Sequence, residues 1–409
     1  MILIKNGLVV ENNKLIKKDI LIDNDKIIKI APLIENNNYL CIDATDSLVM
    51  PGAIDVHVHL REPGYENKET ILTGTKSAMK GGFTSIMAMP NLNPCPDNLN
   101  NLLIEEELIK KNAMVNVYPY GAVSVNEKDE NLADIDSFYN RVYAISDDGR
   151  GVNNLELLEK AMKLAKKYNL VIASHAEDNV YKYDPKGEYV AVRREIELAK
   201  KIGCKYHFCH MSTYESFSAI KKARSEGFTN ITCEVAPHHL VLNESEIKNA
   251  NYKMNPPLRS EENRKATVEA LLDGTVDILA SDHAPHTKEE KSKPYNECPN
   301  GIIGLETMIP IVYTSFVKTG LLSLDRFLDL LVYNPMKIFN LPKYGIYEGS
   351  TCNIAILDIN NPHKYTEDEI LSKGKNSPFI GNTYYGFTKY TILNGKIIYR
   401  KEGKWWKES

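Results

Sequence analysis

The sequence IDVHVHL, residues 54–60, decides the fold because it is the first of a series of similar runs. Its apolar residues alternate with Asp55, His57 and His59. Residues two apart on a β-strand project to the same face, so both histidines are expected on one face, which Asp55 and Arg61 share. This run therefore predicts a strand that carries reactive side chains on one face.

Short strand-like runs of this kind recur through the middle of the chain, with helical stretches between them. The first seven runs begin 25 to 35 residues apart, which is the length of a βα unit, and the last interval is 47 residues. Eight such units in series predict an α/β fold, a closed (β/α)8 TIM barrel, and a doubly wound open sheet is the alternative. The runs begin at Ile54, Thr84, Met114, Arg141, Leu170, Lys205, Asn230 and Asp277.

Helices are predicted between these runs. Residues 154–169 (NLELLEKAMKLAKKYN) and 193–203 (RREIELAKKIG) carry apolar residues at helical spacing. They end in Asn169 and Gly203, residue types that commonly follow the last turn of a helix. The middle of the chain thus alternates between strand and helix, as a barrel requires.

The two ends of the chain differ from the middle. Residues 1–50 and 345–409 are rich in β-branched and aromatic residues, and Asn-Gly pairs in IKNGLVV (4–10) and ILNGKIIY (392–399) predict hairpins. Because the barrel of residues 51–344 lies between these ends, we expect one small β-sandwich domain assembled from both termini. Two separate extensions are the alternative.

Composition and charge exclude several classes of protein. The 409 residues are 43% hydrophobic and 25% charged, which is typical of a globular protein with a large core. With 50 Lys and Arg against 54 Asp and Glu, the formal charge is -4, so no basic surplus is available for a nucleic-acid partner. No apolar run approaches the roughly 18 to 20 residues that span a bilayer, and the first residues do not resemble a signal peptide. We therefore expect no membrane partner and a cytoplasmic location.

Seven cysteines without a Cys-x-x-Cys pair argue against a disulfide framework and a zinc ribbon.

Polar side chains follow the predicted strands at the points where the strands end. In a (β/α)8 barrel, reactive groups converge near the carboxyl ends of the strands. Imidazole and carboxylate suit zinc, and one carboxylate can bridge two ions. Each residue alone has an ordinary alternative, such as a hydrogen-bonded core histidine or an aspartate in a turn, but their coincidence predicts a site for two divalent metal ions, with zinc favoured. Besides His57 and His59, the candidates are Asn91, Asp147, Asp148, His175, His210 and Asp282.

Three other histidines receive no ligand role. His207 is three residues from His210, so in a regular strand it is expected on the opposite face. His238 and His239 follow a predicted strand that Pro237 ends, and they are expected to support the site or to cap a turn.

The residues around the first strand resemble those of the dihydroorotase family, within the amidohydrolase superfamily. The Asp-x-His-x-His sequence at 55–59 is followed by LREPG (60–64), which is similar to the signature of that family. Further similar segments follow in order along almost the whole chain, so the resemblance is highly specific. These segments are GGFTSIMAMPN (81–91), ISDDG (145–149), SHAEDN (174–179), FCHMST (208–213), EVAPHHL (234–240), YKMNPPLR (252–259), SDHAPHT (281–287) and GLETMIP (304–310).

The resemblance implies a metal-dependent barrel with a composite β-domain, which agrees with the fold predicted above. It also implies how the ligands divide between two metal ions. The first ion would be held by His57, His59 and Asp282, and the second by His175 and His210.

The residue that bridges the two ions is expected to be an aspartate. Many members of the superfamily use a carboxylated lysine from the fourth strand, but RVYAISDD (141–148) contains no lysine. This chain resembles instead the bacterial-type dihydroorotases, in which an aspartate takes that place. Asp148 is the expected bridge, and Asp147 is the alternative.

The resemblance further implies the reaction, which is the reversible cyclisation of N-carbamoyl-L-aspartate to L-dihydroorotate in pyrimidine synthesis. In the hydrolytic direction, two metals would lower the pKa of a water molecule enough to supply hydroxide, and one would polarise the ring carbonyl. Asp282 would take the proton of that water and pass it to the leaving amide nitrogen.

The substrate carries a free carboxylate that needs a cationic, planar partner. Arg61 offers such a partner on the metal-bearing face, with Asn91 as a neutral amide beside it. Arg61 as a surface ion-pair residue and Asn255 as a turn residue are the ordinary alternatives. By resemblance, the other residues expected to contact substrate are His59, Asn255, His286 and the backbone groups around Asn300 and Gly301.

Residues 287–300 (TKEEKSKPYNECPN) are polar, contain two prolines and follow the last predicted strand. We expect this loop to act as a mobile lid that excludes water during turnover. A solvated loop without a role is the alternative.

Two other functions fit parts of the pattern. An allantoinase or a hydantoinase (dihydropyrimidinase) has a similar His-x-His region, but Arg61 favours a substrate with a carboxylate, which allantoin lacks. A non-catalytic relative that serves as a scaffold for aspartate carbamoyltransferase would have lost metal-binding histidines, and this chain retains all the expected ones. Association with that transferase in addition to activity stays open, as does the oligomeric state.

Overall fold

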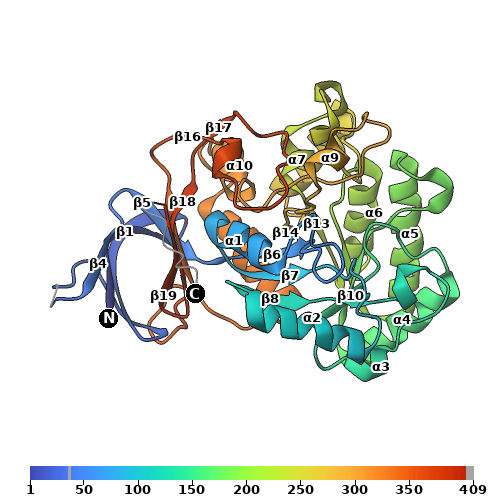
Figure 1. Ribbon diagram of the computed structural model, residues 1–409, viewed down its shortest axis with the longest axis horizontal. Helices are drawn as coiled ribbons and strands as arrows, with labels where there is room; N and C mark the ends of the chain where they lie inside the picture. The colour runs from blue at the N-terminus through green and yellow to red at the C-terminus, as the bar shows by residue number, and fades with distance from the viewer. Residues whose placement is uncertain (36–37, 402–409) are drawn as a thin grey trace.

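The computed structural model describes residues 1–35 and 38–401 and shows two parts side by side (Figure 1). One part is a β-sheet built from both ends of the chain, and the other is a barrel built from the middle. The long helices all belong to the barrel part.

Eight parallel strands close into the barrel, which confirms the predicted fold class. Two hydrogen-bonded sheets make up the ring, one in the order β6-β7-β8 and the other running from β9 to β14. β8 and β9 are the two halves of the third strand, interrupted at Tyr120. The ring closes where Val58, at the end of β6, pairs in parallel with His283, shortly after β14. The strands are β6 (Ala53–Val58), β7 (Phe83–Ala88), β8 (Asn116–Pro119), β9 (Gly121–Ala122), β10 (Ala144–Ser146), β11 (Val171–Ser174), β12 (Lys205–Phe208), β13 (Ile231–Val235) and β14 (Ile278–Leu279).

Helices connect the strands and pack on them through one large apolar core. Asn169 and Gly203 both adopt the left-handed conformation that ends a helix, as the sequence predicted. Within the described residues, no helix is both long and apolar enough to cross a membrane. The connecting helices are α1 (Ile71–Gly81), α2 (Leu99–Asn112), α3 (Ile135–Phe138), α4 (Leu155–Tyr168), α5 (Pro185–Ile202), α6 (Tyr214–Ser225) and α8 (Glu261–Leu272).

The connections after the last two strands are long. Between β13 and β14, α7 (Pro237–Val241) and two 3-10 turns precede α8, which accounts for the interval of 47 residues in the sequence. After β14, α9 (Lys288–Lys291) lies in the loop that leads to α10 (Met308–Val312). The last helical stretch, from α11 (Leu324–Leu328) to α12 (Asn334–Ile338), packs on β6 and β14.

The terminal part is one sheet in the order β19-β18-β15-β5-β1-β2-β3, with β4 paired to β1. The two chain ends meet where β5 and β15 pair antiparallel, with Pro51 opposite Ile354. Both termini therefore contribute to one β-structure, as expected. Hydrogen bonds link its eight strands into a single sheet, whereas a sandwich of two stacked sheets was expected. The strands are β1 (Ile2–Glu11), β2 (Lys14–Asp23), β3 (Lys26–Ala31), β4 (Leu40–Asp43), β5 (Ser47–Pro51), β15 (Ile354–Asp358), β18 (Phe387–Leu393) and β19 (Lys396–Arg400).

This sheet curls around a core of its own, because isoleucines from both chain ends pack into one cluster. Asn394 and Gly395 connect β18 to β19 with positive φ angles of 49° and 72°, which confirms the hairpin predicted there. The division into residues 1–50 plus 345–409 and 51–344 stays a prediction, and residues 402–409 lie outside the described part of the chain.

The Asn-Gly pair at the start of the chain behaves differently, and the hairpin predicted there was wrong. Asn6 and Gly7 form a β-bulge inside β1, where Asn6 has φ 60° and donates its N–H to Asp19 at 2.8 Å. β1 turns into β2 at Asn12 and Asn13, which both have positive φ. The partner that Asp19 provides across the sheet allows the chain to continue through the bulge instead of reversing.

Candidate metal centre

Four of the six predicted metal ligands meet at the carboxyl end of the barrel. His57 and His59 come from the end of β6, Asp148 follows β10, and Asp282 follows β14. The Nε2 atom of His57 lies 3.4 Å from Asp148 Oδ1 and 3.6 Å from Asp282 Oδ1. The Nε2 atom of His59 lies 3.4 Å from Asp148 Oδ2 and 3.3 Å from Asp282 Oδ1. All four side chains are buried.

The other two predicted ligands, His175 after β11 and His210 after β12, complete the cluster. His175 Nδ1 lies 3.7 Å and His210 Nε2 lies 3.5 Å from Asp148 Oδ1. The same two nitrogens are 2.9 Å apart. The structure thus brings all six predicted ligands together in one cluster, in which the carboxylate of Asp148 contacts four imidazoles.

The unsatisfied atoms of this cluster fit a metal ion. His57 Nε2 and Asp148 Oδ1 are buried and have no hydrogen-bond partner among the described residues. Leaving such an atom unsatisfied costs about 1–3 kcal/mol, so buried polar atoms are normally paired. His57, His59 and Asp282 each offer a ligand atom within 4.8 Å of the others, and His57, Asp148 and His210 do the same. A bound divalent cation would satisfy these atoms.

The electrostatics of the cluster also favour a cation. Burial disfavours a charged imidazole, but the carboxylates of Asp148 and Glu234 outweigh it and raise the pKa of His57 well above its usual value. Burial alone would raise the pKa of Asp148 and Asp282, yet the surrounding histidines hold both below the usual range. Carboxylates that draw a proton onto a buried histidine draw a metal cation for the same reason.

Glu234, on β13, is a site residue that sequence reasoning missed. Its Oε1 atom lies 2.7 Å from His57 Nδ1, and its Oε2 atom lies 3.1 Å from His207 Nε2. A carboxylate on one ring nitrogen of a histidine directs the other nitrogen at a metal, so Glu234 orients His57. The signal was present, because an acidic residue inside an apolar strand is rarely buried without a partner. Glu127 and Glu177, which contact Asn91 and His175, were missed as well.

The strand alternation expected for His207 and His210 is not kept. β12 ends at Phe208, and His210 adopts a positive φ of 34°, which turns its side chain into the barrel. Both residues contact Glu234. The ring of His207 lies within hydrogen-bond distance of its carboxylate, and the backbone N–H of His210 donates to the same carboxylate.

The neighbouring Asp147 points away from the cluster. It accepts hydrogen bonds from the N–H groups of Val123 and Ser124 at 2.8 and 3.0 Å. Burial raises its pKa to about 7, against the lowering effect of the bonds from Ser124. The geometry therefore favours Asp148 over Asp147 as the residue between two cation positions.

Asp55 faces the backbone instead of the cluster. It accepts the N–H of Ser281 at 3.1 Å and the N–H of His57 at 3.1 Å. Burial raises its pKa to about 7. Its role is to hold β6 against the chain that leaves β14, where the barrel closes.

Three residues of the site have left-handed backbone conformations. Arg61, His210 and Asp282 have φ angles of 63°, 34° and 48°. Such conformations are uncommon outside glycine, cost about 1–3 kcal/mol each and gather at functional sites. Near Asp282, the N–H of His59 donates to the carbonyl of His283 at 2.9 Å, which ties the turn to β6.

Arg61 lies beside the cluster with donor capacity to spare. Its Nε atom is buried and has no hydrogen-bond partner in the part of the chain that the structure describes. Burial is the largest cause that lowers the pKa of His59 and of His286, and the positive charge of Arg61 lowers both further. Arg61 therefore interacts electrostatically with the site. Arg61 is thus placed to bind an anionic group near the cluster.

Two asparagines predicted to contact substrate also adjoin the cluster. Asn91 donates through Nδ2 to the carbonyl of Asp148 at 2.7 Å and to Glu127 at 2.9 Å. The Nδ2 atom of Asn255 lies 3.0 Å from His175 Nε2. Among the described residues, the Oδ1 atom of each asparagine is buried without a partner, so both retain an acceptor.

His286, Asn300 and Gly301 lie together at the end of the loop that follows β14. Burial and the charge of Arg61 lower the pKa of His286 to about 3, so its ring is neutral at pH 7. His286 Nε2 lies 2.7 Å from the carbonyl of Asn300, and the N–H of Gly301 donates to the carbonyl of Lys253 at 3.0 Å. These backbone groups are therefore already bonded within the protein, and their contact with substrate stays a prediction.

The predicted lid, residues 287–300, contains α9 and is fastened to a neighbouring segment. Lys291 donates to the carbonyls of Ala250, Lys253 and Pro299 at 2.9, 3.2 and 3.0 Å. Lys253 donates to carbonyls inside the loop in turn. Movement of this loop as a lid stays a prediction.

The family model and the curated relatives with the most similar sequences name one family. Residues 46–185 match the family model described as dihydro-orotase-like. A curated dihydroorotase from Staphylococcus epidermidis is 41% identical over 425 residues, which covers 98% of this chain and 100% of that relative. A dihydroorotase from Bacillus cytotoxicus is 42% identical over 382 residues, which covers 88% of this chain and 89% of that relative.

Solved structures show the same architecture. The L-hydantoinase (dihydropyrimidinase) from Arthrobacter aurescens superimposes with a TM-score of 0.88 at 25% identity, covering 98% of this chain and 96% of that chain. A dihydropyrimidinase from Brevibacillus agri gives a TM-score of 0.87 at 25% identity, covering 98% and 95%.

Proposed function

This chain belongs to the dihydroorotase family, and we propose that it catalyses the reversible cyclisation of N-carbamoyl-L-aspartate to L-dihydroorotate with two divalent metal ions. The observation that carries the proposal is the convergence of six buried candidate ligands, Asp148 among them, beside an arginine whose buried Nε donor has no partner among the described residues. The activity class is that of a cyclic amide hydrolase, and two metal ions, with zinc as their identity, belong to the proposal.

We divide the cluster into two overlapping ligand sets that share Asp148. When bound, divalent metal ions supply Lewis-acid activation of water and of carbonyl groups. A set made of imidazole and carboxylate ligands suits zinc. The proposed ligands are His57, His59 and Asp282 for one ion, His175 and His210 for the other, and Asp148 for both.

Asp282 is the group proposed to move the proton. The histidines around it hold its pKa below the usual range in spite of burial, so it is ionised and can accept a proton. In the hydrolytic direction it takes the proton of the attacking water and hands it to the leaving amide nitrogen, and in the biosynthetic direction these steps reverse. Asp282 has a left-handed backbone conformation, and its Oδ1 atom lies 3.3 Å from His59 Nε2.

Arg61 is proposed to bind the free carboxylate of the substrate. A guanidinium can bind a carboxylate with two parallel hydrogen bonds, and the buried Nε atom of Arg61 has no partner in residues 1–35 and 38–401. The Oδ1 acceptors of Asn91 and Asn255, which have no partner in the described part of the chain, suit the N–H groups of the ring. His59, His286, Asn300 and Gly301 complete the proposed substrate contacts.

The main competing function is that of a hydantoinase or dihydropyrimidinase, because solved structures named for those activities share this fold. Hydantoin, dihydrouracil and allantoin carry no carboxylate, so Arg61 would have no partner in any of them. The arginine therefore favours dihydroorotate.

A substrate panel tests the proposal directly. The purified protein is stripped with a chelator, reloaded with zinc, and assayed on dihydroorotate, N-carbamoyl-L-aspartate, dihydrouracil, hydantoin and allantoin. We expect turnover of the first two and about two bound ions per chain. Faster hydrolysis of dihydrouracil would favour the competing function, and a metal-loaded protein without any turnover would favour a scaffold.

Association with aspartate carbamoyltransferase and a cytoplasmic location stay predictions. Gel filtration of the chain with that transferase tests the first, and a stable co-eluting complex is the outcome that would support it.

A further inference from the structure

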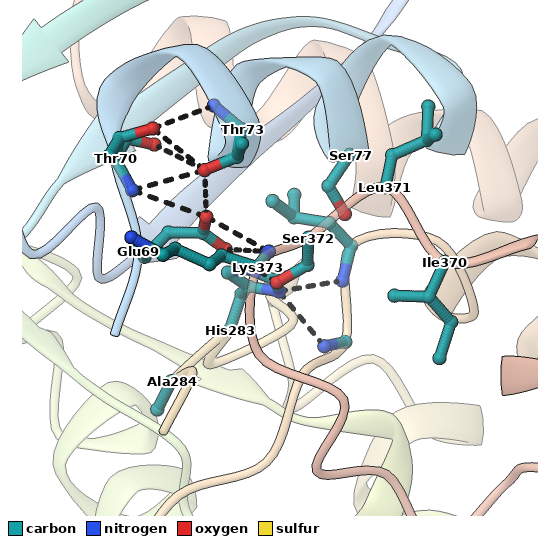
Figure 2. Close-up of polar contacts among 12 residues, drawn as sticks. Glu69, Thr70, Thr73, Ser77, His283, Ala284, Ile370, Leu371, Ser372 and Lys373 are labelled. Carbon is teal, nitrogen blue, oxygen red and sulfur yellow. Dashed lines mark hydrogen bonds and ion pairs between the residues drawn. The ribbon is translucent and has the colours of Figure 1, made fainter. Parts of the chain in front are cut away.

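A segment near the C-terminal end of the chain reaches across to the active end of the barrel. Figure 2 shows residues 370–373 of this segment beside Glu69, His283 and Ala284. We call residues 370–376 the strap, and residues 282–286, which contain Asp282 and His286, the catalytic loop. The strap contacts the catalytic loop at two places.

The first contact runs through Glu69, which is fully buried just before α1. Its Oε2 atom accepts a hydrogen bond from Ser372 Oγ at 2.5 Å, and its Oε1 atom accepts the N–H of Lys373 at 3.2 Å (Figure 2). The same carboxylate lies 3.4 Å from His283 Nε2. Since His283 Nδ1 accepts the N–H of Gly304 at 3.2 Å, its Nε2 carries the proton and donates to Glu69. Glu69 therefore links the strap to the residue next to Asp282.

The second contact is made by Asn376, whose side chain is 3% exposed. Its Oδ1 atom accepts the N–H of His286 at 3.0 Å. Its Nδ2 atom donates to the carbonyls of Ala284 at 3.1 Å and Gly301 at 3.0 Å. One amide thus uses both of its donor hydrogens and its acceptor to hold the catalytic loop against Gly301.

The backbone of the strap also packs closely on the catalytic loop. A Cβ atom at Gly374 would lie 2.7 Å from Pro285 Cβ and 3.1 Å from the backbone nitrogen of His286. The carbonyl of Asn376 accepts the N–H of Ile303 at 2.9 Å. The strap therefore leaves the catalytic loop little freedom to shift on this side.

We propose that the strap positions the catalytic loop for the reaction, with Asn376 and Glu69 as its positioning residues. Asn376 sets the place of His286 and Gly301 on the substrate side, and Glu69 acts through His283 on Asp282. This inference rests on the proposed function, because it uses the roles given there to Asp282 and His286.

The sharpest test is Asn376→Asp. An aspartate keeps the shape and the acceptor but turns two donated hydrogen bonds into contacts between a carboxylate and two carbonyl oxygens. We expect the KM for dihydroorotate to rise by about tenfold, as for loss of an outer-shell partner, with a smaller change in kcat and unchanged metal content. Asn353→Asp is the matched control, because Asn353 is also buried and hydrogen-bonded but lies just before β15, in the terminal part of the molecule.

Ser372→Ala provides a milder second variant, which removes only the hydroxyl that binds Glu69. We expect kcat to fall more than KM changes, because this contact acts on the Asp282 side. The inference would be overturned if KM and kcat were unchanged in both Asn376→Asp and Ser372→Ala. In that case Asn376→Asp would lose only thermal stability, to the same extent as the control Asn353→Asp. A wild-type enzyme that does not turn over dihydroorotate would instead contradict the proposed function.

Discussion

Glu234 lies 2.7 Å from His57 Nδ1, and this contact leaves the Nε2 atom of His57 facing Asp148 and Asp282. The two residues are 177 positions apart in the chain, on the first and seventh strands of the barrel. Burial would raise the pKa of Glu234, but His57 and the hydrogen bond from His207 lower it to about 2, so the carboxylate is charged when it orients the ring.

The first prediction concerns this pair. Glu234→Gln should weaken metal binding by about 10- to 100-fold, because an outer-shell carboxylate fixes the ring and makes it a better ligand. Titration of the stripped protein with zinc measures the change. Glu195→Gln is the control, since Glu195 is equally buried but, among the described residues, its carboxylate contacts the hydroxyls of Ser174 and Tyr206 and the guanidinium of Arg194 instead of a predicted metal ligand. Equal zinc affinity in the two variants would contradict the role of Glu234.

The adjacent aspartates give a second, internally matched prediction. Asp148→Asn should bind less than the full complement of metal and lose nearly all activity, because Asp148 contacts four histidines of the cluster. Asp147→Asn should keep its metal, because the hydrogen bonds of Asp147 within the described residues go to Ser124 and the N–H of Val123 and not to the cluster. Metal analysis of both purified variants decides between them, and a reversed result would assign the bridge to Asp147.

The third prediction concerns substrate charge. Arg61→Met should raise the KM for dihydroorotate by at least about 30-fold, corresponding to roughly 2 kcal/mol, because the substrate carboxylate would lose its cationic partner. Steady-state kinetics measure this effect. Arg141→Met, which removes an exposed ion pair with Glu106, should leave KM unchanged. An unaltered KM in Arg61→Met would remove Arg61 from the substrate contacts.

The fourth prediction concerns stability and pH. Burial raises the pKa of Glu195 from 4.5 to about 7 in the folded protein, although the hydrogen bond from Ser174, the charge of Arg194 and the hydrogen bond from Tyr206 lower it. The folded state therefore binds this proton more tightly than the unfolded state. The resulting stability is fully present below about pH 4.5 and is lost as the pH rises to about 7.

Relative to Glu195→Gln, the free energy of unfolding of the wild type should thus fall by about 2–3 kcal/mol between pH 5 and pH 8. Urea unfolding of both proteins at the two pH values, with the metal removed from both, checks this difference. A difference that stays constant with pH would show that Glu195 is ionised in the folded state.

Much of the fold could be predicted from local patterns. The eight strand runs, their spacing and the helix ends at Asn169 and Gly203 depend on residues within a few positions of one another, and the structure contains them. The Asn-Gly pairs show the limit of this reasoning. One forms a hairpin turn and the other a bulge, because Asp19 on the next strand binds Asn6.

The candidate site divides in the same way. By itself, the sequence determined which histidines and aspartates stand at strand ends and, through its motifs, the family and its chemistry. Only the tertiary structure decided that Asp148 and not Asp147 enters the cluster, that Glu234 orients His57, and that Asn376 reaches His286 from 90 residues away. The physical reason is that strand identity follows from short-range periodicity, whereas the direction of a side chain at a strand end depends on backbone turns and on partners that barrel closure brings together.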